Sequence, residues 1–175
     1  MDLFESNLGT RRGREKYRLR EGFKSMPLSI RKLGFDDLET LALLAREDAD
    51  FDVPGRGEAL EPLGEEAARR YLQNPSLIHW VAEEEGRVVG HMNGYILPLR
   101  AGGVVEFLLY EIGVRNSHRG RGVGKALVRI MLDWMRDNNI QVTWVIADNP
   151  GAFEFYRKCG FGKVEGTLTQ MEVRS

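Results

Sequence analysis

In the first half of the chain, the pattern of apolar and polar residues has the period of a strand in some segments and that of a helix in others. Residues 28–34, LSIRKLG, follow the two-residue period of a strand, and residues 35–48, FDDLETLALLARED, follow the period of a helix. Residues 77–98 predict two strands that are joined at Glu85-Gly86, a hairpin signal. Residues 104–114, VVEFLLYEIGV, are too apolar for an edge strand and are expected near the centre of a sheet.

The second half continues this alternation. The helix that starts at Val123 carries Leu127, Ile130 and Trp134 on one face. The other predicted elements are an irregular loop over 49–63, a short helix over 64–75, a buried strand over 140–148, a short helix from Pro150 to the stop at Gly160, and a closing strand over 166–173. The order β-α-α-β-β-β-α-β-α-β predicts an α/β (α+β) protein with a mixed central sheet of six to seven strands and helices on both faces.

The 175 residues are enough for one domain with a sizeable core, or for one domain with a short extension. Residues 1–27 carry seven basic and four acidic side chains and show no apolar period, so they predict a basic N-terminal extension before a domain at 28–175. The whole chain has a formal net charge of −1, which argues against a nucleic-acid or membrane-surface partner on bulk charge. A basic arm for nucleic acid is a second interpretation of 1–27.

Cys159 is the single cysteine, so an internal disulfide is excluded. The basic start has no apolar h-region after it, and no apolar run is long enough for a membrane span. No histidine, cysteine or carboxylate cluster has the spacing of a metal site. We therefore expect a cytoplasmic protein without a metal.

A glycine-rich turn, HRGRGVGKALV at 118–128, precedes the helix that starts at Val123. Such a turn brings backbone N–H groups close to an anion. It is not a Walker A loop, because only three residues separate Gly120 from Gly124 and Lys125 is followed by Ala126, which has no hydroxyl. It is not a dinucleotide fingerprint either, because Lys125 stands where that pattern needs its third glycine.

The pattern Arg119-x-x-Gly122-x-Gly124 after an apolar strand resembles the pyrophosphate loop of the GCN5-related N-acetyltransferase (GNAT) superfamily. The late segment ADNPGAFEFYRKCGF is similar to the Asn…Tyr…Gly-Phe signature of the same family, and the resemblance extends over about residues 28–173. It implies the GNAT fold with a splayed central strand pair, and acetyl-CoA as cosubstrate.

The resemblance also implies a cofactor site. Backbone groups of the strand before the loop would hold the pantetheine, the loop would hold the pyrophosphate, and Asn149 and Tyr156 would contact the pantetheine arm and the sulfur. By position, the implied cofactor-binding residues are Ile112, Gly113, Val114, Arg119, Gly120, Arg121, Gly122, Val123, Gly124, Lys125, Asn149 and Tyr156.

Glu106 and Glu111 are the two carboxylates on the strand before the loop. A regular strand would point them to opposite faces, whereas a single bulge, which is typical of this superfamily at this strand, would bring both to one face. Glu111 is nearer the thioester and is our first candidate for the general base, with Glu106 as the second. Tyr156 matches the tyrosine that protonates the thiolate in the family, and its alternative role is that of a core aromatic.

Residues 47–66 hold eight carboxylates and one basic residue, Arg56, so a polycationic acceptor is expected. The segments GHMNGYILP, EFLLYEIGV and HRGRGVGKAL are similar in order to class I aminoglycoside 3-N-acetyltransferases, which implies an aminoglycoside acceptor bound by Asp50, Asp52, Glu106 and Glu111. The acidic run before the late tyrosine of those enzymes is replaced here by ADNPGAFEFY. A homodimer is common among similar proteins.

Two alternatives stay open. One is an acetyltransferase for a protein N-terminus or another small amine, although Trp144 stands near the position where the ribosomal-protein type carries a glutamate. The other is a non-catalytic acyl-CoA sensor, which the presence of both Glu111 and Tyr156 disfavours.

Overall fold

The computed structural model describes residues 28–52, 58–100 and 102–164. The chain divides into two compact units, the first ending at Val145 and the second starting at Ile146, and each is described by itself. The predicted basic extension, 1–27, and the predicted closing strand, 166–173, lie outside the described residues.

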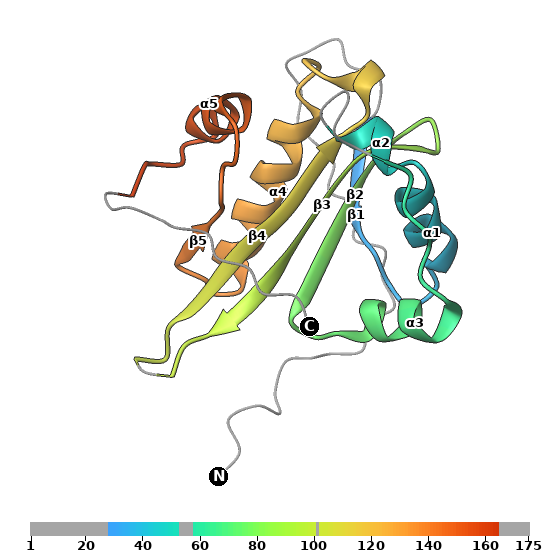
Figure 1. The fold of residues 1–175 in the computed structure, drawn as a ribbon. Helices are drawn as coiled ribbons and strands as arrows, with labels where there is room; N and C mark the ends of the chain where they lie inside the picture. Colours follow the sequence, from blue (N-terminus) through green and yellow to red (C-terminus); the bar gives the residue numbers. More distant parts are fainter. Residues whose placement is uncertain (1–27, 53–57, 101, 165–175) are drawn as a thin grey trace. The chain divides into compact units, whose positions relative to one another are not determined.

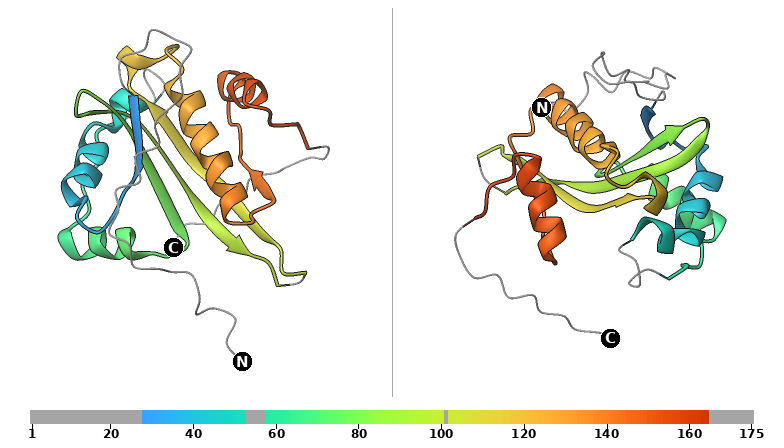
Figure 2. Two further views of the ribbon diagram at one scale, coloured as in Figure 1. Left: turned by 180° about the vertical axis from the view of Figure 1, so that it is seen from behind. Right: turned by 90° about the horizontal axis from the view of Figure 1, so that it is seen from above.

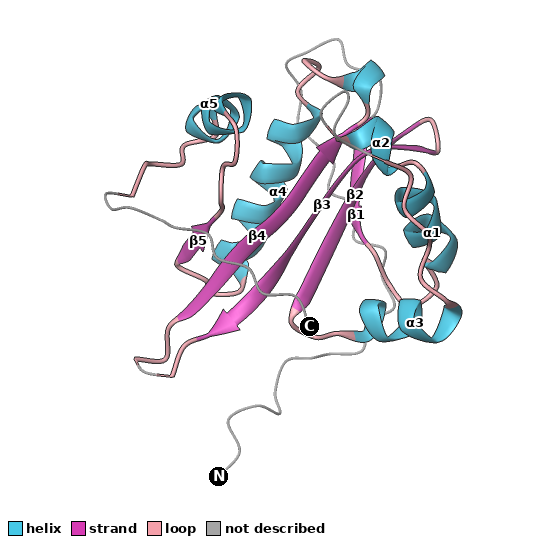
Figure 3. Cartoon of the chain, in the orientation of Figure 1, coloured by secondary structure: helices cyan, strands magenta, loops and turns pink. Residues whose placement is uncertain are grey.

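One five-stranded sheet, in the order β1-β2-β3-β4-β5, organises the first unit (Figures 1 and 3). The first four strands pair antiparallel with their neighbours, and β5 pairs parallel with β4. The strands are β1 (Leu28–Lys32), β2 (Leu77–Glu84), β3 (Arg87–Pro98), β4 (Val105–Val114) and β5 (Val142–Trp144). The α/β prediction and the hairpin at Glu85-Gly86, where both residues have positive φ, are confirmed.

Two predictions about individual elements are wrong. The buried strand expected over 140–148 is a three-residue strand at the edge of the described sheet, with Val142 43% and Trp144 38% exposed. The loop expected over 49–63 contains part of a four-residue helix, α2 (Asp48–Phe51), too short to show a helical period. The sheet expected to hold six to seven strands has five within the described residues.

Helices cover both faces of the sheet in the first unit (Figure 2). On one face, Trp134 of α4 (Val123–Asp137) packs edge-to-face on Trp80 and Phe107, with ring centroids 5.4 and 5.5 Å apart. On the other face lie α1 (Leu38–Arg46), α2 and α3 (Glu65–Gln73). The second, smaller core there consists of Leu33, Leu44, Phe51, Val81 and Val88.

Arg115 ties α2 to the end of β4. Its guanidinium is 3% exposed and forms ion pairs with Glu47 and, at 2.6 Å, with Asp50, and it lies 4.6 Å from the centroid of the Phe51 ring. Its Nε also donates to the carbonyl of Val88 at 2.9 Å. Because these contacts satisfy a buried cation from several sides, α2 is held where β4 ends.

Arg119 makes a second link between the same two segments. Its Nη2 donates to the carbonyl oxygens of Phe51, at 3.0 Å, and of Asp52, and its Nε donates to the carbonyl of Val114 at 3.1 Å. Helix α2 leaves its last carbonyl groups without helical partners, and Arg119 supplies donors to two carbonyls there.

Gly94 of β3 packs closely against β4, and a Cβ added there would be 2.4 Å from Phe107 Cζ and 2.5 Å from the Leu108 carbonyl oxygen. We expect Gly94→Ala to lower the free energy of unfolding by roughly 1–3 kcal/mol, because a backbone atom cannot give way to the methyl group. Gly64→Ala is the matched control, because its Cβ would meet no atom within 4 Å. Equal denaturant midpoints for the two variants would contradict this account.

Asp50 should stabilise the fold in a pH-dependent way. Burial raises the pKa of Asp50, but hydrogen bonds from Arg115 and from the N–H of Asn116 outweigh burial and hold this pKa below its usual value. The stabilisation is therefore present above the unfolded-state pKa of about 3.9 and is lost as the pH falls through the lower folded-state value. We expect Asp50→Asn to cost about 1 kcal/mol at pH 7 and to cost less near pH 3, as measured by chemical denaturation.

Asp36→Asn is the control for this measurement, because Asp36 is exposed on the turn before α1. Its substitution should leave the free energy of unfolding unchanged at both pH values. A cost for Asp50→Asn that stays the same from pH 7 to pH 3 would show that the ion pair is not its source.

Candidate active site

Strand β4 contains one extra residue in the middle of its pairing with β3. Asn93 pairs with Glu111 and Gly94 pairs with Leu109, so Tyr110 bulges out of the ladder. The predicted bulge is confirmed, and its consequence follows from the register: Glu106 pairs with Leu97 and Glu111 with Asn93, two odd-numbered positions of β3. Both carboxylates therefore lie on one face of the sheet.

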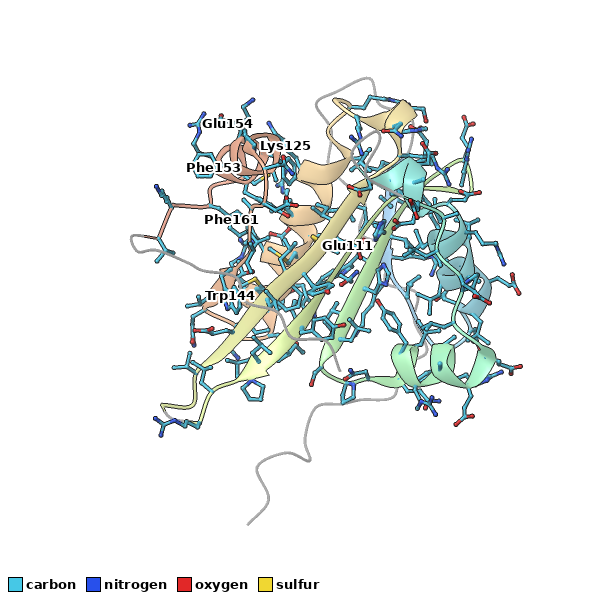
Figure 4. The ribbon with its side chains drawn as sticks, viewed as in Figure 1. Glu111, Lys125, Trp144, Phe153, Glu154 and Phe161 are labelled. Atoms are coloured by element: carbon cyan, nitrogen blue, oxygen red, sulfur yellow. The ribbon has the colours of Figure 1, made fainter. Side chains whose placement is uncertain are left out.

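Glu111 is half-buried and accepts a hydrogen bond of 2.8 Å from the side-chain amide of Asn93. Burial raises the pKa of Glu111, the bond from Asn93 counteracts this, and the negative charge of Asp52 adds to the rise. A carboxylate with a raised pKa is a stronger base than an ordinary glutamate while it remains charged near neutral pH. Glu111 has the environment that a general base needs, and Figure 4 shows it on β4.

Polar residues continue along the same face of the sheet. Burial, together with the negative charge of Glu111, raises the pKa of Asp48 on α2. Burial lowers the pKa of His79 to about 3 and that of His91 to about 4, so both rings are neutral at pH 7. Their centroids are 5.6 Å apart, and Tyr71 is hydrogen-bonded to His79 Nδ1 at 3.0 Å.

Glu106, the second candidate base, has a different environment. It lies at the start of β4, where Trp144 Nε1 donates to its carboxylate at 3.0 Å. The carboxylate therefore has a partner on the edge strand, five residues before Glu111. Both candidates lie on one face of the sheet and both are partly exposed, and they differ in their partners, Trp144 for Glu106 and Asn93 for Glu111.

The second half of β4 has an open edge. Pairing with β5 covers Glu106–Leu108 only, so within the described residues β4 continues past β5 from Leu109 to Val114. Arg115 N–H donates to Val89 on β3, and alternate residues of a strand direct their N–H groups to opposite edges. The N–H groups of Ile112 and Val114 are therefore directed to the open edge, where a ligand can add as a further strand.

The glycine turn follows this open edge. After a short 3₁₀ turn at Asn116–His118, Gly120 and Gly122 have φ of 73° and 88°, conformations that a side chain would strain. A Cβ at either glycine would meet no atom of the described residues within 4 Å, so these residues leave the backbone of the turn open to a ligand. Helix α4 starts directly after Gly122, and the positive end of its dipole favours an anion at this point.

The basic side chains of the turn have unequal roles in the structure. Lys125 is exposed on the first turn of α4 (Figure 4). Arg121 donates to both oxygens of Glu84 at 3.3 Å, and His118 Nε2 is 3.0 Å from the same carboxylate. Arg119 is engaged with backbone carbonyl groups, as described above. Its predicted contact with phosphate, like that of Arg121, stays a prediction.

The second unit carries the other two predicted cofactor residues on α5 (Pro150–Lys158). The side-chain oxygen of Asn149 accepts from Ala152 N–H at 2.8 Å, so Asn149 caps the helix, and its predicted contact with pantetheine stays a prediction. Tyr156 is 7% exposed and its ring packs against Phe155 and Phe161. Burial, with the charges of Cys159 and Asp148, raises the pKa of Tyr156 to about 12, which keeps its hydroxyl protonated.

Sequence reasoning missed three residues that organise the site: Asn93, Glu84 and Arg115. A polar amide inside the apolar strand GHMNGYILP was a usable signal for Asn93, and a basic residue directly after an apolar strand was one for Arg115. Asp50, predicted to bind substrate, has Arg115 as its partner, and its predicted contact with an acceptor stays a prediction.

Among the described residues, no helix has the length and apolar character to cross a bilayer.

Comparison with known proteins identifies the family of the chain. Residues 41–161 match the acetyltransferase (GNAT) family. The N-alpha-acetyltransferase RimI of Mycobacterium tuberculosis is 33% identical over 130 residues, which cover 71% of this chain and 79% of that protein. N-acetyltransferase 8 of Rattus norvegicus is 32% identical over 99 residues, 54% of this chain, and the chain spans 44% of that relative's length.

Solved structures share the fold at lower sequence identity. A soil-metagenome aminoglycoside acetyltransferase, meta-AAC0020, superposes with a TM-score of 0.72 at 20% identity, over 85% of this chain and 97% of that one. The aminoglycoside N-acetyltransferase AAC(6')-Iy in complex with CoA gives a TM-score of 0.61 at 20% identity, over 83% and 94% of the two chains. The match over 41–161, the RimI relative and the bulged strand before the glycine turn lead to one conclusion: the chain belongs to the acetyltransferase (GNAT) family.

Proposed function

We propose that this chain is an acetyl-CoA-dependent N-acetyltransferase that transfers the acetyl group directly to an amine in a ternary complex. The observation that carries the proposal is the bulge in β4. It leaves the half-buried carboxylate of Glu111 beside the stretch of strand whose N–H groups face an open edge, a few residues before the glycine turn. A base, a carbonyl-polarising donor and an anion site thus follow each other along one strand and turn.

The cosubstrate would lie along this strand and turn. Backbone N–H groups from Gly120 to Lys125 and the start of α4 would hold the pyrophosphate, with the Lys125 ammonium adding charge. Backbone groups of Ile112, Gly113 and Val114 would hold the pantetheine. Clear space at Gly120 and Gly122 fits this assignment, because phosphate oxygens need close approach to the backbone.

The chain's own residues would then carry the proton transfers. The amine nitrogen attacks the acetyl carbonyl carbon while the N–H of Ile112 or Val114 stabilises the developing oxyanion. Glu111 accepts the proton that the amine loses, directly or through water. The C–S bond breaks and the sulfur takes up a proton, for which Tyr156, whose hydroxyl is protonated at neutral pH, stays the predicted donor.

We propose the 3-amino group of an aminoglycoside as the acceptor. Asp48 and Glu111 support a polycationic acceptor, because neither carboxylate forms an ion pair with a described lysine or arginine. The aminoglycoside acetyltransferases that share the fold lend further support. The second candidate is the α-amine of a protein N-terminus, which the similarity to the RimI of Mycobacterium tuberculosis favours.

Gly122→Glu should abolish binding of acetyl-CoA in calorimetry, because it places a side chain and a negative charge where the pyrophosphate is expected. The control is Gly103→Glu, since Gly103 also has a positive φ, 62°, and also has no atom within 4 Å of an added Cβ. Gly103→Glu introduces a comparable backbone strain in the β3–β4 turn and should bind normally. Normal binding by Gly122→Glu would remove the turn from the cofactor site.

Glu111→Gln should lower turnover by roughly 10²–10⁴-fold with little change in the Kd for acetyl-CoA, because a positioned base is lost. In the wild type, the carboxylate form is the active one, so activity should fall as the pH drops through the raised pKa of Glu111. The measurement is kcat against pH, and the acid limb should be absent in Glu111→Gln.

Two further variants sharpen this assignment. Asn93→Leu removes the hydrogen bond that favours the charged carboxylate, so the acid limb should move to higher pH. Glu106→Gln should leave the limb in place. If Glu106→Gln removes the limb and Glu111→Gln keeps it, Glu106 is the base.

A panel of amines with acetyl-CoA, followed by thiol release, tests the acceptor. We expect gentamicin to be turned over, with a KM that rises with ionic strength as the attraction between opposite charges is screened. Turnover of alanyl peptides without turnover of any aminoglycoside would favour the second candidate. Tight acetyl-CoA binding without thiol release for any amine would identify a non-catalytic sensor.

A further inference from the structure

We propose that Tyr110 is an acceptor-binding residue: its ring forms the surface on which the saturated, amine-bearing ring of an amino sugar stacks while the amine reaches Glu111. The inference rests on the proposed function and names a residue that determines specificity for it. The geometry that carries it is the same bulge that orients Glu111.

Tyr110 lies next to the base and on the same face of the sheet. It is the unpaired residue of the bulge, directly before Glu111 in sequence. Its ring makes an edge-to-face contact with Tyr95, with centroids 5.7 Å apart and planes at 87°. Tyr95 lies two residues from Asn93 on β3, so its side chain shares a face with the amide that holds Glu111. Tyr95, Tyr110 and Glu111 therefore lie close together on one face of the sheet.

The exposure of Tyr110 distinguishes it from a structural aromatic. Tyr110 is 67% exposed, a larger fraction than that of any other described aromatic residue; Phe35 follows at 63%. A packed aromatic of the sheet, such as Trp80 or Phe107, is buried almost completely. Tyr95 holds one side of the Tyr110 ring and leaves most of its surface in contact with water. Covering that surface with a ligand would remove a large apolar area from water.

The chemistry of this surface favours a cationic saturated ring over a flat aromatic one. An electron-rich tyrosine face attracts ammonium groups and the C–H bonds next to them. Glu111, the next residue along β4, supplies negative charge, and Asp48 interacts electrostatically with Glu111. An amino sugar or aminocyclitol meets both conditions, because its ring carries polarised C–H bonds and several ammonium groups.

The test is calorimetric titration of gentamicin into the full chain in the presence of coenzyme A. Tyr110→Ala should raise the Kd by about fivefold to tenfold, the size expected for the loss of a cation–π or stacking contact. Tyr110→Phe should keep the wild-type Kd, because it keeps the ring. Phe35→Ala, an equally exposed aromatic on the turn before α1, should bind like the wild type. The Kd for acetyl-CoA should be the same in all four proteins.

The proposal is overturned if gentamicin does not bind, or if Tyr110→Ala binds it as well as Phe35→Ala does. It is also overturned if Tyr110→Ala weakens binding of an alanyl peptide and not that of gentamicin. A parallel thiol-release assay distinguishes failure of this inference from failure of the proposed function. Gentamicin binding that depends on Tyr110 without any turnover would support this inference and refute the proposed activity.

Discussion

The arrangement of the site depends on one extra residue in β4. Without the bulge, Tyr110 would pair with Asn93 and Glu111 with Met92, which would put Glu111 on the face where Trp80 packs against Trp134 of α4. The bulge instead turns the carboxylate toward the face of α1–α3 and keeps Phe107 and Leu109 in the core. One extra residue thus allows Phe107 and Leu109, before the bulge, to pack in the core, while Glu111, after it, lies on the opposite face of the sheet.

Two arginines tie the two sides of this site together. Arg115 and Arg119 both connect the end of β4 and the turn after it with α2, one through side-chain carboxylates and one through backbone carbonyl groups. Part of the negative charge of 47–52 therefore has a partner within the protein itself. Asp48 and Asp52 add negative charge near Glu111, because each of the two carboxylates interacts electrostatically with it.

The sequence was sufficient for most of the fold. Alternation predicted β3 and β4, and the spacing of glycines and basic residues in 118–128 excluded two other anion-binding loops. It was not sufficient for α2, because a four-residue helix is too short to show a helical period, and it predicted a longer, buried strand where β5 is a three-residue strand at the edge of the described sheet. Nor could it show that Arg115 pairs with Asp50, because the two are 65 positions apart and only the fold brings them together.

The two buried histidines give the site a thermodynamic dependence on acid that is separate from its chemistry. In an unfolded chain each ring takes up a proton near pH 6.5, whereas the folded protein keeps His79 and His91 neutral down to about pH 3 and pH 4. Between these limits the unfolded state binds more protons, so each histidine lowers the free energy of unfolding as the pH falls. Acidification would therefore destabilise the sheet beside Glu111 by mass action on protons.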